Sequence, residues 1–342
     1  MSDFLPKKDG YNVAVLGATG AVGQTMLDIL AEKDFPIAEL VLIASSRSAG
    51  SSISFKKKDY IVQDIEKFDP LGLDIALFSA GGGTSLKYAQ LFADAGCYVV
   101  DNSSAWRMDD EVALVVPEVN PEALEMAKDN RIIANPNCST IQMVVALKPL
   151  HDEVPIQRVV VSTYQAVSGA GGKGIKELSE QTQALLACQE AKTDIFSSRI
   201  AFNVIPHIDV FMDDGYTKEE QKMILETKKI MGSDIAVTAT TVRVPVFYGH
   251  SESINITFKD ALNAEKARSI LADASGIAVV DDPSGEDYPT AVDAAGNDSV
   301  WVGRIRDDAS CENSLHLWVV ADNVRKGAAL NAVQIAEILI AS

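Results

Sequence analysis

Cys138 stands where a short apolar run gives way to a helix-compatible one, and this position favours nucleophilic chemistry. The run over 131–134 is interrupted at Asn135 and Pro136, because proline removes a strand hydrogen-bond donor and keeps its predecessor extended. An apolar stretch compatible with a helix then starts near Ser139. A thiolate at a helix N-terminus is stabilised by the helix dipole, and the free N–H groups there can hold an oxyanion. The alternative is a small buried cysteine that caps the helix.

Two other residues could complete a site for an acidic acyl substrate. Arg243 is a charge within the apolar, β-branched strand predicted over 236–246, and His250 follows the turn at 247–249. An arginine can bind a carboxylate in bidentate fashion, and a histidine beside a thiol can move a proton. Either residue could equally be structural. We interpret the other histidines, His151, His207 and His316, as structural.

Three glycines follow the first apolar strand, which is predicted over 12–16. Gly17, Gly20 and Gly23 allow a tight turn and bring backbone N–H groups against a pyrophosphate at the start of the next helix, predicted over 24–30. Their spacing is G-x-x-G-x-x-G, and the strand–turn–helix context is what favours nucleotide binding over a purely structural turn.

The end of the second strand, predicted over 39–44, indicates which nucleotide is bound. No carboxylate lies near this strand end to accept a hydrogen bond from a ribose 2′-hydroxyl. Ser45, Arg47 and Ser48 can instead supply hydroxyls and a guanidinium for a 2′-phosphate, so the sequence favours NADP. The alternative is that Arg47 is an ordinary exposed loop arginine.

Two later loops also follow predicted strands of the same sheet. Ala80 and Gly81 come directly after the strand predicted over 74–79, where a doubly wound sheet meets its ligand. Arg107 lies in the polar loop 101–108 and is a candidate phosphate clamp.

Strands and helices alternate in the first part of the chain, whereas strands collect in the second part. This order predicts an α/β protein with a Rossmann-type doubly wound parallel sheet, plus a second α+β domain with a mainly antiparallel sheet. In the second part we expect a flexible glycine loop over 166–174 and amphipathic helices over 175–189 and 219–229. The last helix is expected to return to the first domain. The predicted domains are 1–134 with 324–342, and 135–323.

The composition limits the partners. The chain has 342 residues, 47% of them hydrophobic, and a formal net charge of −18, which argues against a nucleic-acid partner. No apolar run approaches the length of a membrane span, and residues 1–10 lack the apolar core of a signal peptide, so we expect a cytoplasmic protein. The four cysteines and four histidines have no metal-like spacing, so we expect free thiols and no metal. Cys97 is expected in the core and Cys188 in helix packing.

Six segments in this order resemble the aspartate-β-semialdehyde dehydrogenase family over essentially the whole chain. They are GATGAVG at 17–23, ASSRSAG at 44–50, NPNCST at 135–140, YQAVSGAG at 164–171, RVPVFYGH at 243–250 and DNVRKGAA at 322–329. The resemblance implies NADPH-dependent reductive dephosphorylation of L-aspartyl-4-phosphate to L-aspartate-4-semialdehyde and phosphate. This reaction is an early step toward lysine (through diaminopimelate), methionine and threonine. The resemblance also implies a homodimer formed through the second domain.

The resemblance further implies a role for each matching residue. Cys138 becomes the nucleophile, Gln165 orients the acyl intermediate and His250 is the acid/base. The substrate-binding residues are implied to be Arg243 for the α-carboxylate, Glu219 for the amino group, and Arg107 and Lys222 for the phosphate, with Asn102 beside them. The cofactor-binding residues are implied to include Thr19, Ala21, Val22, Ser168, Gly169 and Asn323 in addition to the glycines and loop residues above. Without the resemblance, Glu219 and Lys222 would be explained as a solvated i, i+3 pair on a helix.

Three competing hypotheses stay open at this point. N-acetylglutamyl-phosphate reductase and glyceraldehyde-3-phosphate dehydrogenase share the thiol and hydride chemistry, although the cysteine contexts that they usually show differ from NPNCST at 135–140. A catalytically silent, nucleotide-binding paralogue is the third. The joint presence of Cys138, Gln165, Arg243 and His250 favours an enzyme.

Overall fold

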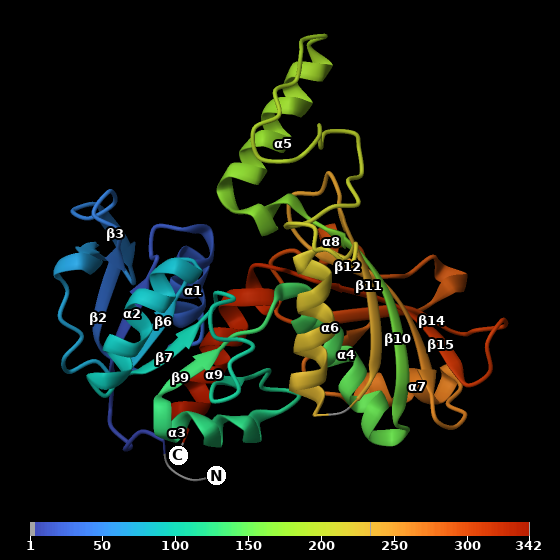
Figure 1. The fold of residues 1–342 in the computed structure, drawn as a ribbon, viewed down its shortest axis with the longest axis horizontal. Coiled ribbons are helices and arrows are strands. Elements are labelled where there is room, and N and C mark those ends of the chain that lie inside the picture. Colours follow the sequence, from blue (N-terminus) through green and yellow to red (C-terminus); the bar gives the residue numbers. More distant parts are fainter. Residues whose placement is uncertain (1–3, 233, 342) are drawn as a thin grey trace. The chain divides into compact units, whose positions relative to one another are not determined.

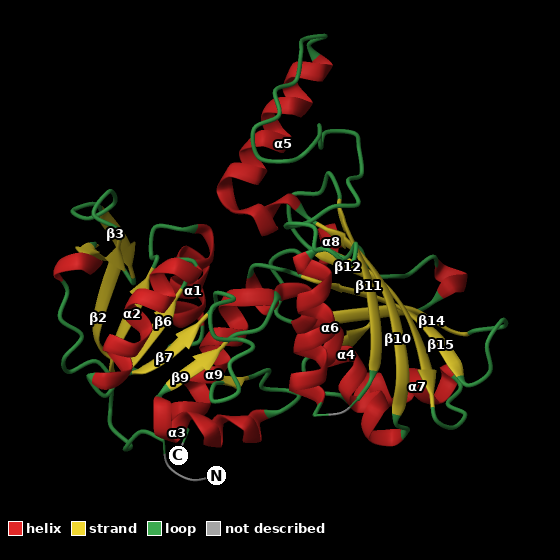
Figure 2. Cartoon of the chain, in the orientation of Figure 1, coloured by secondary structure: helices red, strands yellow, loops and turns green. Residues whose placement is uncertain are grey.

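The computed structural model describes residues 4–232 and 234–341, and the chain divides into two compact units. The first unit contains the residues up to Asn137 together with those from Ala328 onward, and the second contains Cys138–Gly327. Figure 1 labels elements of both units where there is room, and Figure 2 distinguishes helices from strands. None of the helices within 4–232 and 234–341 is long and apolar enough to cross a membrane.

The first unit is built on a seven-stranded sheet in the order β5-β2-β1-β6-β7-β9-β8, with every pair parallel. The central strands are buried on both faces, which explains their continuous apolar runs. This sheet confirms the Rossmann-type prediction. The C-terminal helix α9 packs against α1, β6 and β7. The strands are β1 Tyr11–Leu16, β2 Ile37–Ala44, β5 Gln63–Asp64, β6 Ile75–Phe78, β7 Tyr98–Asp101, β8 Ala113–Leu114 and β9 Ile132–Ala134, with a separate hairpin of β3 Ser52–Phe55 and β4 Lys58–Ile61. The helices are α1 Ala21–Glu32, α2 Gly82–Asp94, α3 Ala127–Asn130 and α9 Leu330–Ile340, with 3₁₀ turns at Ile65–Lys67 and Pro121–Met126.

The second unit is built on a six-stranded sheet in the order β11-β10-β12-β15-β14-β13. The pairs β10–β12, β12–β15 and β14–β15 are antiparallel, whereas β10–β11 and β13–β14 are parallel, so the sheet is mixed and mainly antiparallel, as predicted. Helices α4 and α6 pack against this sheet (Figure 1). The strands are β10 Ile156–Gln165, β11 Ala236–Arg243, β12 His250–Phe258, β13 Ile277–Val279, β14 Val300–Asp307 and β15 Ser314–Ala321. The helices are α4 Cys138–Glu153, α5 Gly171–Leu186, α6 Lys218–Met231, α7 Ala264–Asp273 and α8 Ala291–Ala294, with 3₁₀ turns at Val167–Ala170 and Pro283–Gly285. A π-helical turn at Arg325–Ala329 begins in this unit and ends in the first.

The glycine-rich stretch of the second unit is helical, so the prediction of a flexible loop over 166–174 is wrong. Val167–Ala170 form a 3₁₀ turn, and α5 starts at Gly171. A Cβ on Gly174 would come within 2.6 Å of the carbonyl oxygen of Val167, so the missing side chain lets the helix start pack against the turn before it. Helix α5 therefore begins earlier than predicted, and Cys188 after its end is exposed rather than packed.

Candidate active site

The glycine turn of the first unit brings main chain against main chain. Gly17 has φ +86°, and a Cβ there would lie 2.5 Å from the carbonyl oxygen of Ser79. A Cβ on Gly23 would lie 2.3 Å from the carbonyl oxygen of Gly17. The N-cap of α1 is Gly20, and no side chain caps it, so the amides of the first turn, Ala21, Val22 and Gly23, are left to a ligand or water. This cradle fits a pyrophosphate.

A pocket of about 420 Å³ lies beside this turn. A volume of this size is typical of a small-molecule site. Its lining contains seven of the predicted cofactor residues: Gly17, Thr19, Gly20, Ser45, Arg47, Ser48 and Ala80. It also contains residues that the sequence analysis did not select, among them Ile65, Glu66, Thr84, Lys87 and Tyr88. The predicted Gly81 precedes α2 with φ +83°.

Glu66 lines this pocket, so the expectation that no carboxylate lies near the end of β2 is wrong. Strand β5 pairs in parallel with β2, with Ala44 opposite Asp64, and this pairing brings the following turn to the same sheet edge. The carboxylate of Glu66 lies 3.9 Å from Nζ of Lys87 on α2. Both side chains are largely exposed, so the pair itself adds little to stability.

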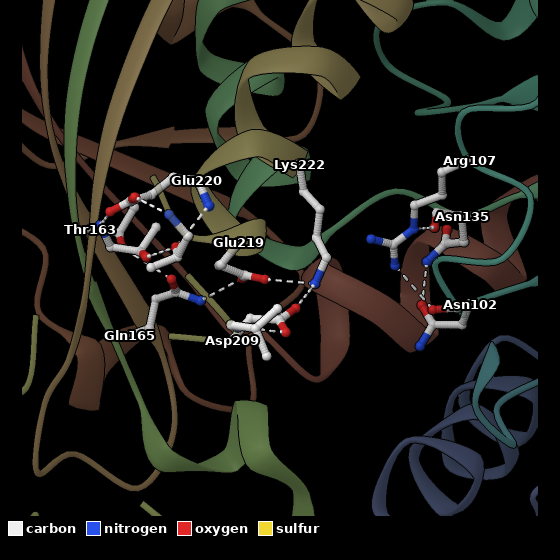
Figure 3. Close-up of polar contacts among 12 residues, drawn as sticks. Asn102, Arg107, Asn135, Thr163, Gln165, Asp209, Glu219, Glu220 and Lys222 are labelled. Atoms are coloured by element: carbon white, nitrogen blue, oxygen red, sulfur yellow. Dashed lines mark hydrogen bonds and ion pairs between the residues drawn. The ribbon is translucent and has the colours of Figure 1, made fainter. Parts of the chain in front are cut away.

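Arg107 is buried and fixed by the backbone of its own unit. Its Nε donates to the carbonyl oxygen of Asn135 at 2.9 Å, and its Nη2 donates to the carbonyl oxygen of Asn102 at 3.1 Å (Figure 3). Nδ2 of Asn135 donates to Oδ1 of Asn102 at 2.7 Å, and Nδ2 of Asn331 on α9 donates to Oδ1 of Asn135 at 2.7 Å. The structure therefore brings the predicted residues Asn102 and Arg107 together. These hydrogen bonds fix the position of the Arg107 guanidinium, and so of its positive charge.

Cys138 is the first residue of α4, as the Asn-Pro interruption predicted, and it is partly exposed. Gly327 passes close to it, because a Cβ on Gly327 would lie 2.9 Å from Cβ of Cys138. Cys97 is buried, and desolvation raises the pKa of its thiol strongly. The remaining cysteines, Cys188 and Cys311, are exposed. Cys138 therefore combines partial access with a helix N-terminus, which is the environment expected of a reactive thiol.

Gln165, Glu219 and Lys222 form one chain of polar contacts in the second unit (Figure 3). Nε2 of Gln165 donates to Oε1 of Glu219 at 3.1 Å, and Nζ of Lys222 donates to Oε2 of Glu219 at 3.1 Å and to Asp209 at 2.8 Å. Glu219 is only 5% exposed, so the explanation of a solvated surface pair is wrong. Burial alone would lower the pKa of Lys222, but the carboxylates of Glu219 and Asp209 raise it.

Arg243 ends β11 and is almost completely buried. Its Nη1 donates to the carbonyl oxygen of Ala166 at 2.7 Å. Burial lowers the pKa of Arg243, and the negative charges of Glu219 and Cys138 oppose that shift. A Cβ on Gly169 would lie 2.7 Å from Nη1 of Arg243. The predicted Gly169 therefore keeps space open around the guanidinium.

His250 begins β12 and is fully buried. Its Nδ1 accepts a hydrogen bond from the backbone N–H of Ala166 at 3.0 Å. Burial, and then the charge of Arg243, lower its pKa well below the ordinary histidine value. The ring is therefore neutral at physiological pH.

Asn323 and Ser168 are buried and bound to one another. Their side chains are hydrogen-bonded at 2.9 and 3.1 Å, and Oδ1 of Asn323 also accepts from the backbone N–H of Gly249 at 3.0 Å. This contact fixes the two residues beside the turn that leads into His250. The predicted cofactor residues Ser168, Gly169 and Asn323 belong to the second unit, whereas the other predicted cofactor residues belong to the first.

Comparison with known proteins identifies the family. Residues 12–127 match the family described as semialdehyde dehydrogenase, NAD binding domain, and residues 147–326 match semialdehyde dehydrogenase, dimerisation domain. The chain is 58% identical over 334 residues to the aspartate-semialdehyde dehydrogenase of Aquifex aeolicus, covering 97% of this chain and 98% of the relative. The chain belongs to the aspartate-semialdehyde dehydrogenase family. It is therefore an oxidoreductase of amino-acid biosynthesis with a nicotinamide-binding domain, and the dimerisation domain supports a homodimer.

Solved structures of aspartate-semialdehyde dehydrogenases agree with this fold. One from Vibrio cholerae, described as complexed with ASA, is 53% identical, has a TM-score of 0.96, and covers 98% of this chain and 99% of that one. One from Candida albicans, described as with NADP, is 28% identical, has a TM-score of 0.74, and covers 96% of this chain and 98% of that one.

Some polar groups around these side chains were not identified from the sequence. No sequence pattern around Asp209 indicated a role for it, because its contact with Lys222 depends on the folded chain. Glu220 could have been predicted, because Thr217 and Glu220 have the spacing of a capping box. The Thr217 side chain accepts from the backbone N–H of Glu220, and the Glu220 side chain accepts from that of Thr217, at the start of α6. The backbone of Ala166, which contacts both Arg243 and His250, could not be predicted from residue type.

Proposed function

We propose that this protein catalyses the NADPH-dependent reductive dephosphorylation of L-aspartyl-4-phosphate to L-aspartate-4-semialdehyde and phosphate, through a thioester on Cys138. In this role it would serve lysine, methionine and threonine biosynthesis. The observation that carries the proposal is the position of Cys138, a partly exposed thiol at the start of α4 whose charge reaches the buried Arg243.

In the proposed mechanism, Cys138 attacks the acyl carbon and expels phosphate. The dipole of α4 and the charge of Arg243 favour the thiolate, which is the reactive form of cysteine. The resulting thioester is a better hydride acceptor than an oxygen ester, which accounts for a cysteine at this position. Gln165 is held through Glu219 and orients the acyl group.

Charged side chains are proposed to recognise both ends of the substrate. One guanidinium nitrogen of Arg243 binds Ala166, and its other N–H groups are the proposed donors to the α-carboxylate. Glu219 is proposed to receive the amino group. Arg107 and Lys222 are proposed to bind the phosphate, with Asn102 holding Arg107 in position. These cations supply the local positive charge that a protein of net charge −18 needs to bind a dianion.

The glycine turn of the first unit is proposed to hold the cofactor pyrophosphate, and Ser45, Arg47 and Ser48 the 2′-phosphate. When bound, the reduced nicotinamide supplies a hydride to the acyl carbon. Ser168, Gly169 and Asn323 are proposed to hold its nicotinamide end.

We also propose where the homodimer forms. Strand alternation puts a half-exposed face on the six-stranded sheet, with Tyr164 paired to Ser251 across the β10–β12 ladder and Ser253 paired to Trp318 across the β12–β15 ladder. The rings of Tyr164 and Trp318 lie 5.5 Å apart between centroids. Half-exposed aromatic side chains in the matched dimerisation domain are suited to a second copy of the chain.

Turnover assays test the function directly. The purified protein should reduce NADP in the presence of aspartate semialdehyde and phosphate, and should be far slower with N-acetylglutamate semialdehyde or glyceraldehyde 3-phosphate. A preference for either of those aldehydes would overturn the substrate assignment. Absence of turnover with all three, together with retained nucleotide binding, would favour the silent paralogue.

A further inference from the structure

Arg107 lies on a loop that other polar side chains hold in place. Strand β7 ends at Asp101, and the next strand, β8, begins at Ala113. The guanidinium of Arg107 is buried and donates to two carbonyl oxygens, those of Asn102 and Asn135 (Figure 3). These bonds fix the tip of the side chain, whereas the position of its backbone depends on the loop.

Trp106, the residue before Arg107, ties this loop to helix α2. Its indole Nε1–H donates to Oγ of Ser85 at 3.0 Å. Ser85 is only 1% exposed and lies in the first turn of α2, and this helix packs against β7. The preceding residue, Thr84, lines the pocket beside the glycine turn. The loop is therefore anchored to a packed helix rather than to another loop.

Asp101 completes the chain of hydrogen bonds. An indole N–H can only donate, so Ser85 accepts from Trp106 and keeps its own hydroxyl hydrogen for Asp101, to which it is hydrogen-bonded. The same carboxyl group accepts from Oγ of Ser103 at 2.6 Å and from the backbone N–H of Ser103 at 3.2 Å. Oγ of Ser103 in turn accepts from the backbone N–H of Ala105 at 3.2 Å. The loop is therefore held at two points, Ser103 and Trp106.

Arg107 also lies in the field of the Asp101 carboxyl group. Burial raises the pKa of Asp101, and hydrogen bonds from Ser103 and Ser85, followed by the charge of Arg107, oppose that shift. Both Asp101 and Arg107 are buried. A movement of the loop would separate two buried charged groups, so the electrostatics favour the same loop position as the hydrogen bonds.

We propose that Trp106 and Ser85 are positioning residues for the phosphate: their hydrogen bond holds the loop so that Arg107 is ordered before the phosphate binds. This inference rests on the phosphate contact proposed for Arg107. A cation that is already ordered in the free protein loses little conformational freedom on binding, so the anion binds more tightly. Breaking the hydrogen bond should therefore weaken phosphate binding although the charge of Arg107 is retained.

Trp106→Phe and Ser85→Ala each break this hydrogen bond and change no charge. In turnover of aspartate semialdehyde with phosphate and NADP, each variant should raise KM for phosphate about 2- to 10-fold, the range expected of one neutral hydrogen bond. The KM values for the other two reactants, and kcat at saturating phosphate, should stay close to wild type, because bound phosphate can still order the guanidinium. Ser104→Ala, at an exposed residue of the same loop, is the matched control and should keep the wild-type KM for phosphate.

The double variant tests whether the two residues act through one bond. Trp106→Phe combined with Ser85→Ala should raise KM for phosphate no more than the larger of the single changes, since either change alone breaks the bond. Multiplied effects on this KM would overturn the proposal. Parallel changes in kcat and in all three KM values would also overturn it, because they would show a general loosening of the first unit.

Arg107→Met separates this inference from the proposed function. KM for phosphate should rise further in this variant than in the hydrogen-bond variants, because the cation itself is lost. If Arg107→Met raises this KM and the other two variants do not, the positioning role is wrong and the proposed function stands. If Arg107→Met also leaves it unchanged, Arg107 does not bind the phosphate and the inference falls.

Calorimetric titration with inorganic phosphate covers the case in which the protein does not turn over aspartate semialdehyde. The Kd for phosphate should then follow the same order, with the wild type and Ser104→Ala binding most tightly and Arg107→Met most weakly. Equal Kd values for the wild type and Trp106→Phe, or no phosphate binding by the wild type, would overturn the inference.

Nitrogen-15 labelling of tryptophan tests the hydrogen bond itself in solution. The chain has three tryptophans, and the Trp106 indole signal is identified by its absence in Trp106→Phe. Ser85→Ala should shift this signal and speed the exchange of its hydrogen with water. The signals of Trp301 and Trp318, both in the second unit, should not change. An unchanged Trp106 signal would mean that the bond is not formed, and would overturn the proposal whatever the kinetic result.

Discussion

Nε2 of Gln165 donates to Oε1 of Glu219 across 3.1 Å, and both side chains are almost completely buried. The other oxygen of this carboxylate accepts from Lys222, so one buried charge joins the end of β10 to the first turn of α6. Asp209 binds the same lysine from outside this pair and is more exposed. The two carboxylates therefore share a cation but differ in their connection to Gln165.

Glu219→Gln should weaken binding of the amino-acid part of the substrate. The change removes the negative charge proposed for the amino group and keeps the side-chain shape, so KM for aspartate semialdehyde should rise about 10- to 100-fold, a loss of about 1.4–2.7 kcal/mol. KM for phosphate should change much less. The matched control is Asp209→Asn, which removes a carboxylate from the same lysine. If the two variants have the same KM for the semialdehyde, Glu219 has no special contact with the amino group.

Cys138→Ser should abolish turnover with the fold intact. Serine at the same position has no low-pKa thiolate, so kcat should fall by about three orders of magnitude or more. The exposed Cys188 and Cys311 provide matched controls, and their serine variants should keep wild-type kcat. Iodoacetamide labelling at neutral pH adds a second readout. Cys138 should react faster than the two exposed thiols, and an equal rate would mean that the thiol is not activated.

Arg47→Met should lower the affinity for NADP more than for NAD. Arg47 lines the pocket that we propose for the nucleotide, together with Lys87 and Glu66, and a lost contact to a phosphate costs about 1.5–3 kcal/mol. Glu66→Gln should raise the affinity for NADP relative to that for NAD. The wild-type carboxylate would repel a 2′-phosphate, whereas it can accept a hydrogen bond from a 2′-hydroxyl. Competition binding of 2′,5′-ADP and 5′-AMP measures this without turnover. Identical ratios of the two affinities in both variants and the wild type would show that these residues do not set cofactor preference.

The local parts of the site could be predicted from the sequence. Apolar β1 followed by Gly17 and Gly20 is a strand–turn–helix pattern, and Pro136 marks where β9 ends and α4 begins at Cys138. These features depend on neighbours along the chain, so backbone rules suffice for them.

Features that depend on pairing between distant segments could not be predicted. Glu66 reaches the pocket beside the glycine turn through the parallel pairing of β5 with β2. The glycine-rich start of α5 was predicted as a loop, because glycine has low helix propensity and the close packing of Gly174 on Val167 is a tertiary contact. The role of the Ala166 main chain depends on Arg243 and His250, which are far along the sequence.

Tyr164→Arg should dissociate the homodimer. Tyr164 is 38% exposed on the half-exposed sheet face and contacts Trp318. An arginine here would place a charge without a partner in the proposed interface, and burying that charge would weaken association. Light scattering coupled to size-exclusion chromatography should show the monomer mass for this variant and the dimer mass for Leu71→Arg, a control at an exposed residue of the first unit. A dimeric Tyr164→Arg protein would place the interface elsewhere.

Glu252 should make the protein less stable as the pH rises. It is fully buried on β12, and desolvation raises its pKa well above the ordinary value of 4.5, although Gln142 opposes the shift. The folded state therefore binds a proton that the unfolded state releases. This contribution to stability is fully present below the ordinary glutamate pKa and is lost as the pH rises through the folded-state pKa.

Glu252→Gln removes this dependence, because the amide has a similar shape and no proton to release. Between the ordinary and the folded-state pKa, the free energy of unfolding of the wild type should fall relative to the variant by about 1.4 kcal/mol per pH unit. Urea unfolding at a series of pH values measures the difference. Glu312→Gln, at an exposed residue, is the matched control and should run parallel to the wild type. Parallel curves for Glu252→Gln and the wild type would mean that the buried carboxyl group is ionised in the folded protein.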